Sequence, residues 1–168
     1  KVYIHNTQFY AKLFEGEKYC YDNVRRWTKR GKGKCDIFAM DRVIFPINVG
    51  GQHWCLAVAH MKEGKIEYFD SMGGGGRACL GHLRQYIADE KRYKKGEALD
   101  MAKWSDNNLV SLGRSVPQQT NGNDCGVFMV MFTTYNAQGR DCSEFGMTHV
   151  PHCRQLITHC IVEKKAPP

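Results

Sequence analysis

Three stretches of the chain have the apolar patterning of β-strands. Arg42–Val49 (RVIFPINV) is rich in β-branched residues, and Pro46 within it indicates a sheet edge or an irregularity. His53–His60 (HWCLAVAH) is apolar on both faces, which predicts a central strand covered on each side. Lys65–Ser71 follows after a short turn. These last two segments are therefore expected to form an antiparallel hairpin centred near residues 62–63.

Other stretches repeat with a helical period. The pattern predicts a helix from Arg77 to about Lys95, with three residues on one stripe: Leu80, Leu83 and Ile87. A short helix is expected within residues 3–14, where Phe9 and Leu13 are apolar. Residues 109–113 are expected to form a short strand.

The C-terminal third contains two further helical patterns. Cys125–Asn136 is apolar all round, which is typical of a helix enclosed by the rest of a domain. His152–Ile161 is amphipathic, and one face collects five residues: Cys153, Leu156, Ile157, Cys160 and Ile161. Strands and helices are mixed, with the strands antiparallel where pairing can be judged, so the fold class is α+β.

Length and composition indicate one folded domain spanning residues 1–168. A chain of this size buries roughly 70% of its unfolded surface, and 42% of its residues are hydrophobic. No apolar run approaches the length of a membrane span, so no membrane partner is expected. The chain begins at Lys1 without a Met, which leads us to expect a fragment.

Charge and cysteine content narrow the function classes. The formal charge is +7, and basic residues are dense over Arg25–Lys34. Such a run suits a solvated loop, an acidic protein partner, nucleic acid or a weak nuclear-import sequence, and charge alone does not separate them. The eight cysteines include no Cys-x-x-Cys pair, and the chain is not a small secreted scaffold, so reduced intracellular thiols are expected.

Cys125 is a candidate nucleophile because it lies where a polar turn (TNGND) gives way to the apolar helix. The dipole and unpaired N–H groups of a helix N-terminus favour the reactive thiolate form of a cysteine. Gly126 leaves room beside the sulfur, and the amides around it could face a developing oxyanion. Taken by itself, Cys125 is more often a buried core cysteine.

A cysteine nucleophile needs a base and a group that orients the base. In the expected hairpin, paired positions sum to about 125, so His53 lies opposite Met72 and Asp70 opposite Cys55. His53 and Asp70 would then share one face at the open end of the hairpin, within reach of each other. A register slip of one residue would separate them.

A side-chain amide before Cys125 could donate to the oxyanion of a tetrahedral intermediate. Gln119 lies six residues before Cys125 on a polar loop, and its neighbour Gln118 is chemically equivalent. The chemistry of the two residues does not choose between them.

These residues carry a resemblance to the Ulp/SENP family of SUMO-specific cysteine proteases. INVGGQHWCLAVAHMKEGKIEYFDS followed by PQQTNGNDCGVF looks like its catalytic core, and FYAKL with YDNVRRWTKR is similar to its SUMO-specific branch. The match runs from about Phe9 to the final helix. It implies a papain-like or adenain-like core, mostly antiparallel sheet flanked by helices, with the nucleophile at the start of a buried helix.

The resemblance also implies a role for each site residue: Cys125 as nucleophile, His53 as general base, Asp70 as its orienter and Gln119 as oxyanion donor. Trp54 would line a narrow tunnel that admits only glycines, with Gly126 beside it. A Trp-Leu-x-Asp segment that the family carries upstream has no match here. We therefore expect an N-terminally truncated domain, or one completed by an N-terminal segment or a second chain.

The hypothesis is a protease and isopeptidase that cleaves after the C-terminal Gly-Gly of SUMO. Its basic surface, including Arg25 and Arg26, would meet an acidic face of the modifier. Rivals are a protease for another ubiquitin-like protein, a cysteine acyltransferase, or a non-catalytic module that binds the modifier or nucleic acid. An intracellular location in the nucleus or at the nuclear envelope is expected.

No metal or cofactor is expected. The histidines and cysteines within HVPHCRQLITHC (residues 149–160) do not have the spacing of a tight zinc finger. Gly73–Gly76 precedes a helix but lacks the Lys-Ser/Thr of a phosphate-binding loop, so we interpret it as a flexible loop beside the active site.

Overall fold

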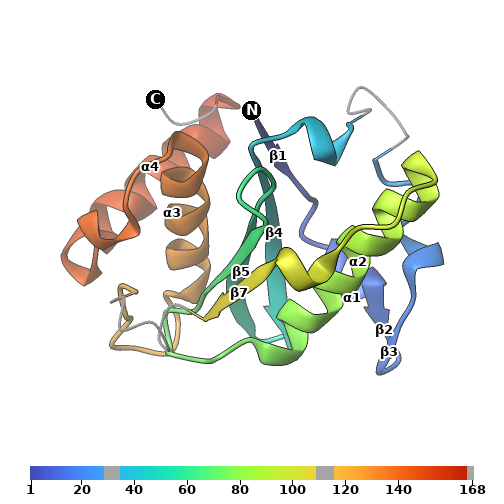
Figure 1. Ribbon diagram of the computed structural model, residues 1–168. Coiled ribbons are helices and arrows are strands. Elements are labelled where there is room, and N and C mark those ends of the chain that lie inside the picture. The colour runs from blue at the N-terminus through green and yellow to red at the C-terminus, as the bar shows by residue number, and fades with distance from the viewer. Residues whose placement is uncertain (29–34, 109–115, 166–168) are drawn as a thin grey trace.

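The computed structural model describes residues 1–28, 35–108 and 116–165. A five-stranded sheet lies at its centre (Figure 1), in the order β1 (Val2–Ile4), β4 (Arg42–Val49), β5 (His53–His60), β6 (Lys65–Phe69) and β7 (Ser105–Asn108). The longer helices are α1 (Phe9–Leu13), α2 (Arg77–Lys95), α3 (Cys125–Gln138) and α4 (Val150–Glu163). A small hairpin joins β2 (Phe14–Glu15) to β3 (Lys18–Tyr19). Single 3₁₀ turns cover Tyr21–Asn23, Ile37–Ala39, Met101–Lys103, Cys142–Glu144 and Met147–His149.

The hairpin predicted from the sequence forms the middle of the sheet. β5 is the central strand and pairs antiparallel with both β4 and β6. Leu56 pairs with Phe69 and Ala57 with Tyr68, so the paired positions sum to 125, and the predicted register is confirmed. The outermost strands differ from the expectation, because β1 is parallel to β4 and β7 is parallel to β6.

Pro46 lies where β4 becomes an edge. β1 pairs with β4 only from Arg42 to Ile44, so the side of β4 that faces β1 has no ladder partner at Pro46. A proline at that position costs no ladder hydrogen bond, because its missing N–H has no strand to bind. The interpretation of Pro46 as an edge residue is therefore confirmed.

Helices cover both faces of the sheet, with α1 and α2 on one side and α3 and α4 on the other (Figure 1). Along β5, Cys55 and Ala57 pack in the core with α1 and α2, whereas Leu56 and Val58 pack in the core with α3. This arrangement explains why β5 is apolar on both faces. α2 has the predicted bounds, and its three predicted stripe residues are buried: Leu80, Leu83 and Ile87.

α4 departs from its predicted apolar face. Cys153 is buried, but Ile161 is 71% exposed. α4 forms an outer layer against α3 (Figure 1), so its early turns reach the core and its last turns extend past it. The amphipathic pattern predicted the helix correctly and overestimated how much of it is covered.

One strand lacks an apolar pattern altogether. β7 reads SDNN and joins the sheet through backbone pairing with β6, a contact that hydrophobic periodicity cannot reveal. The predicted strand at 109–113 lies outside the described residues. Within the described ranges, we find no helix with the length and apolar character required for a membrane span.

Candidate active site

The β5–β6 hairpin brings His53 and Asp70 together at its open end. His53 is the first residue of β5, and Asp70 directly follows β6. The distance between His53 Nε2 and Asp70 Oδ1 is 2.7 Å, which is a hydrogen bond. The predicted meeting of these two side chains is confirmed by this contact.

Asp70 is buried and held from several sides. Its carboxylate accepts hydrogen bonds from the backbone amides of Met72 (2.7 Å) and Gly74 (3.1 Å) as well as binding His53. A Cβ added at Gly74 would lie 2.3 Å from Asp70 Oδ2, so only glycine allows the backbone to come this close. The glycine run predicted beside the active site thus forms part of the cradle that orients the carboxylate.

The second nitrogen of His53 is available for chemistry. Nδ1 is buried and has no hydrogen-bond partner among the described residues. Because Nε2 faces an acidic acceptor, Nε2 carries the proton in the neutral ring and Nδ1 presents its lone pair. A buried acceptor without a partner destabilises a residue that has only a structural role. A general base, in contrast, needs a nitrogen whose lone pair is free to accept a proton.

Cys125 begins α3, as predicted, and lies next to the start of β5. Its side chain is largely buried, and the positive end of a 14-residue helix points toward it. A Cβ added at Gly126 would touch Trp54 Cδ1 at 3.7 Å, so the indole of Trp54 lies against the first turn of α3. Trp54 directly follows His53, so this contact places the first turn of α3 against the start of β5.

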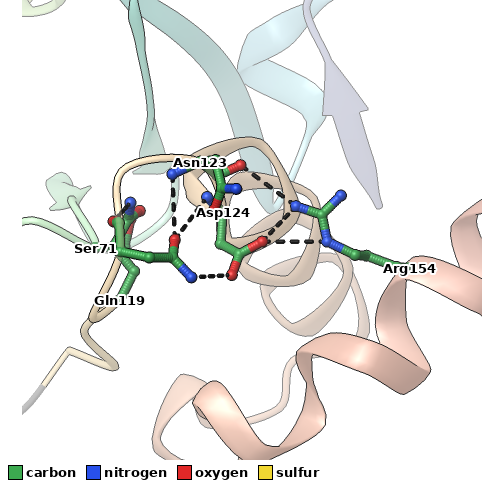
Figure 2. Close-up of polar contacts among 6 residues, drawn as sticks. Ser71, Gln119, Asn123, Asp124 and Arg154 are labelled. Carbon is green, nitrogen blue, oxygen red and sulfur yellow. Dashed lines mark hydrogen bonds and ion pairs between the residues drawn. The ribbon is translucent and has the colours of Figure 1, made fainter.

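The two glutamines that the sequence could not separate have different surroundings. Gln118 Nε2 donates to the backbone carbonyls of Asp70 and Val116, both at 3.0 Å. Gln119 accepts from Ser71 Oγ at 2.6 Å and donates to the carbonyl of Asn121 at 2.5 Å, as Figure 2 shows for the Ser71 side. Both glutamines thus contact the Asp70 loop, Gln118 through the carbonyl of Asp70 and Gln119 through Ser71, and only Gln119 also binds Asn121 in the turn before Cys125.

The structure does not bring Arg25 to the catalytic residues. Arg25 lies 3.3 Å from Asp22 and over the ring of Tyr93 at 5.5 Å. Tyr93 is near the C-terminal end of α2, whereas the other end of α2 follows the loop that binds Asp70, roughly 25 Å away at 1.5 Å per residue. Arg26 is exposed on the same segment, so both arginines are remote from Cys125.

A further thiol that the sequence reasoning passed over lies beside the His53–Asp70 pair. Donor atoms of His53, Cys55 and Asp70 all lie within 4.8 Å of one another, and no other such group of three occurs in the described part of the chain. Burial raises the pKa of Cys55 to about 12, so this sulfur is protonated beside the His53–Asp70 pair. We therefore assign the group to the catalytic pair and not to a metal.

Comparison with known proteins places the chain in a family. Residues 1–159 match the profile of the Ulp1 protease family, C-terminal catalytic domain. The chain belongs to the Ulp1 protease family. The sentrin-specific protease of Caenorhabditis elegans is 38% identical over 165 residues, which cover 98% of this chain and 22% of that protein. The ubiquitin-like-specific protease ESD4 of Arabidopsis thaliana is 34% identical over 166 residues, covering 99% and 33% respectively.

Solved structures of the Ulp1 family share the fold. The SUMO protease Ulp1 with its catalytic cysteine oxidized to a sulfenic acid superposes with a TM-score of 0.80 at 30% identity, covering 97% of this chain and 69% of that one. The C-terminal Ulp1 protease domain in complex with Smt3, the yeast ortholog of SUMO, gives 0.78 at 30% identity, covering 96% and 68%. The predicted fold class is confirmed. The chain spans only about a fifth to a third of these curated Ulp1-family relatives.

Proposed function

We propose that this chain is a thiol protease and isopeptidase that cleaves after the C-terminal Gly-Gly of SUMO. The observation that carries the proposal is the 2.7 Å contact of His53 Nε2 with Asp70, which leaves Nδ1 buried and without a partner among the described residues. Cys125 begins the helix whose first turn lies against Trp54, the neighbour of His53. The family and its structural neighbours, one of them bound to the yeast ortholog of SUMO, support the substrate class.

In the proposed reaction, His53 Nδ1 accepts the thiol proton and the sulfur of Cys125 attacks the glycine carbonyl. Asp70 holds the ring and stabilises the imidazolium that forms. The oxyanion is stabilised by the side-chain amide of Gln119 together with backbone amides at the start of α3, including that of Gly126. His53 then protonates the leaving amine, and a water activated by the same histidine hydrolyses the acyl-enzyme.

Substrate selection is proposed to begin at Trp54. Its flat indole lies against Gly126 at the entrance to the catalytic residues, so a chain without Cβ atoms passes where a larger residue would clash. Arg25 and Arg26, remote from Cys125, are proposed to meet an acidic face on the body of the modifier. Their contribution should weaken as salt increases, because exposed charges are screened.

The test is turnover of a fluorogenic amide of the SUMO C-terminus by this chain. Cys125→Ser should lose at least about a thousandfold in kcat, because the nucleophile is removed. Cys142→Ser is the matched control, since Cys142 is equally buried, and it should stay within about threefold of the wild type. Undiminished turnover by Cys125→Ser would overturn the mechanism.

Matched amides of other ubiquitin-like modifiers test the substrate. Cleavage of one of them faster than SUMO would reassign the substrate while leaving the mechanism in place.

A nuclear location is proposed from the basic run that begins at Arg25. Imaging of a tagged protein with and without the substitutions Arg25→Ala and Arg26→Ala tests this proposal.

A further inference from the structure

Asp124, the residue directly before the proposed nucleophile, is a buried carboxylate in an unfavourable place. It is 5% exposed and makes no side-chain capping bond to α3. A negative charge this close to Cys125 opposes the thiolate that the reaction needs. The positive end of α3 favours a carboxylate at its N-cap, so the other partners of Asp124 decide how strongly its charge opposes the thiolate.

Arg154 on α4 supplies the missing counter-charge. Its Nε donates to Asp124 Oδ1 at 3.1 Å, and its Nη2 contacts the same oxygen and the carbonyl of Asn123 at 3.4 Å (Figure 2). Together with Asn121, this arginine lowers the pKa of the Asp124 carboxyl below its usual range, which keeps the carboxyl ionised and bound. Two guanidinium nitrogens on one carboxylate also define an orientation, which a single lysine ammonium does not.

The contact continues from Asp124 into the loop before it. Asn121 Nδ2 donates to Asp124 Oδ2 at 2.7 Å, while Asn121 Oδ1 accepts from the amides of Asn123 and Asp124, each at 3.2 Å. The carbonyl of Asn121 accepts from Gln119, which in turn accepts from Ser71, the neighbour of Asp70. A continuous series of hydrogen bonds thus runs from α4 to the proposed oxyanion donor and to the Asp70 loop.

We propose that Arg154 is a positioning residue that fixes the loop between Gln119 and Cys125 and neutralises the carboxylate beside the nucleophile. This inference rests on the proposed role of Cys125. Arg154 does not contact the reacting atoms. It acts through Asp124 and Asn121, so that the sulfur and the Gln119 amide keep their relative position while the thiolate is not opposed by an unpaired negative charge.

The test compares Arg154→Gln with a matched control at the other end of α3. Arg140 has a similar exposure, 48% against 51% for the Arg154 side chain, and likewise donates two guanidinium nitrogens to one carboxylate oxygen, that of Glu144. Arg154→Gln should lower kcat roughly tenfold to a hundredfold with KM changed less than threefold, because the reacting groups are misplaced. Arg140→Gln should leave kcat and KM unchanged.

A second measurement does not depend on substrate. Alkylation of Cys125 by iodoacetamide, followed by mass spectrometry of its peptide, gives a pH profile whose midpoint should rise by about 0.5 pH or more in Arg154→Gln. His53, Asp70 and Cys55 on the β5–β6 side are unchanged in that variant, so the difference reports the Asp124–Arg154 pair. The double variant Asp124→Asn with Arg154→Gln removes both charges and should restore the midpoint while kcat stays low.

The outcomes separate this inference from the proposed function. If the wild type neither turns over SUMO substrates nor reacts at Cys125, the proposed function fails. If the wild type is active and Arg154→Gln matches it in kcat and midpoint, or Arg140→Gln loses as much, the positioning role is overturned. Arg154→Lys keeps the positive charge but lacks the planar guanidinium. It should restore the midpoint of the alkylation pH profile but only part of kcat. This variant also tests the positioning role if Arg154→Gln does not fold.

Discussion

The β5–β6 hairpin carries a histidine–carboxylate pair at each end, and we propose a catalytic role for only one of them. At the open end, His53 Nε2 lies 2.7 Å from Asp70, and at the closed end His60 Nε2 lies 2.8 Å from Glu67. Both ends also have a cysteine nearby, since Cys142 lines a cavity of about 310 Å³ together with His60 and Glu67. Residue types and the histidine–acid distance therefore do not distinguish the two ends.

The difference lies in what surrounds the pair. Glu67 is also bound by Lys65 at 3.1 Å; although burial opposes ionisation, bonds from His60 and Lys65 lower its pKa to about 2. Burial, with Asp141 and Glu67 nearby, raises the pKa of Cys142 to about 12, and this cysteine follows the C-terminal, negative end of α3. Cys125 begins the same helix at its positive end. The orientation of α3 thus distinguishes the proposed nucleophile, Cys125, from Cys142.

The largest difference between the two ends of the hairpin should appear when His53 and His60 are replaced one at a time. His53→Gln should lower kcat/KM on a SUMO amide by roughly a thousandfold or more, because the general base and acid is lost. His60→Gln should stay within about threefold, since no reacting group faces it. Steady-state kinetics below the unfolding temperature of both variants checks this, and an equal loss in the two would break the comparison.

The next largest difference is expected between Asp70 and Glu67. Substitution of Asp70 should reduce activity, whereas substitution of Glu67 should reduce stability. Asp70→Asn should cost roughly a hundredfold or more in kcat, because a neutral amide does not stabilise the imidazolium and its NH2 group can donate to Nε2, which favours the wrong tautomer. Glu67→Gln should leave kcat nearly unchanged and lower the free energy of unfolding by about 1–3 kcal/mol, since it removes the negative charge and one of the two oxygens that bind Lys65 and His60. Urea unfolding and kinetics on the same samples measure both quantities. A catalytic loss in Glu67→Gln would contradict the assignment.

The smallest effect is a pH dependence confined to the closed end. The folded pKa of Glu67, about 2, lies below its unfolded value of 4.5, so its stabilisation is present above pH 4.5 and is lost as the pH falls toward 2. Between these limits the wild type should lose up to roughly 3 kcal/mol more stability than Glu67→Gln. Unfolding curves of the wild type and Glu67→Gln at pH 6 and pH 2.5 test this. An equal difference in free energy of unfolding between the two proteins at both pH values would exclude Glu67 as the source.

Several parts of the active site were predictable because local pattern decides them. The register of β5 against β6 follows from a short turn and alternating side chains, so His53 and Asp70 could be placed within reach of each other from the spacing of residues alone. Cys125 could be placed at a helix start because a polar turn ends where the apolar run begins. Neither inference needed contacts between distant segments.

Other parts could not be predicted, because they depend on packing between segments far apart in the chain. Nothing in the apolar pattern of α4 indicates that Arg154 reaches Asp124, 30 residues away. The basic run indicated a charged surface, but only the path of α2 shows that Arg25 lies far from Cys125. The polar β7 pairs with β6 through its backbone, and its sequence SDNN has no apolar pattern that would indicate a strand.

The sequence by itself determined the hairpin, its register and the buried helix, because these follow from periodicity over short distances. The roles of the candidate catalytic residues came from the family resemblance. The tertiary structure decided which end of the hairpin meets the positive end of α3, and this supports the group at the open end as the proposed catalytic one. It also decided how Asp124 is neutralised. Both depend on how helices pack against a sheet, which no local pattern of residues specifies.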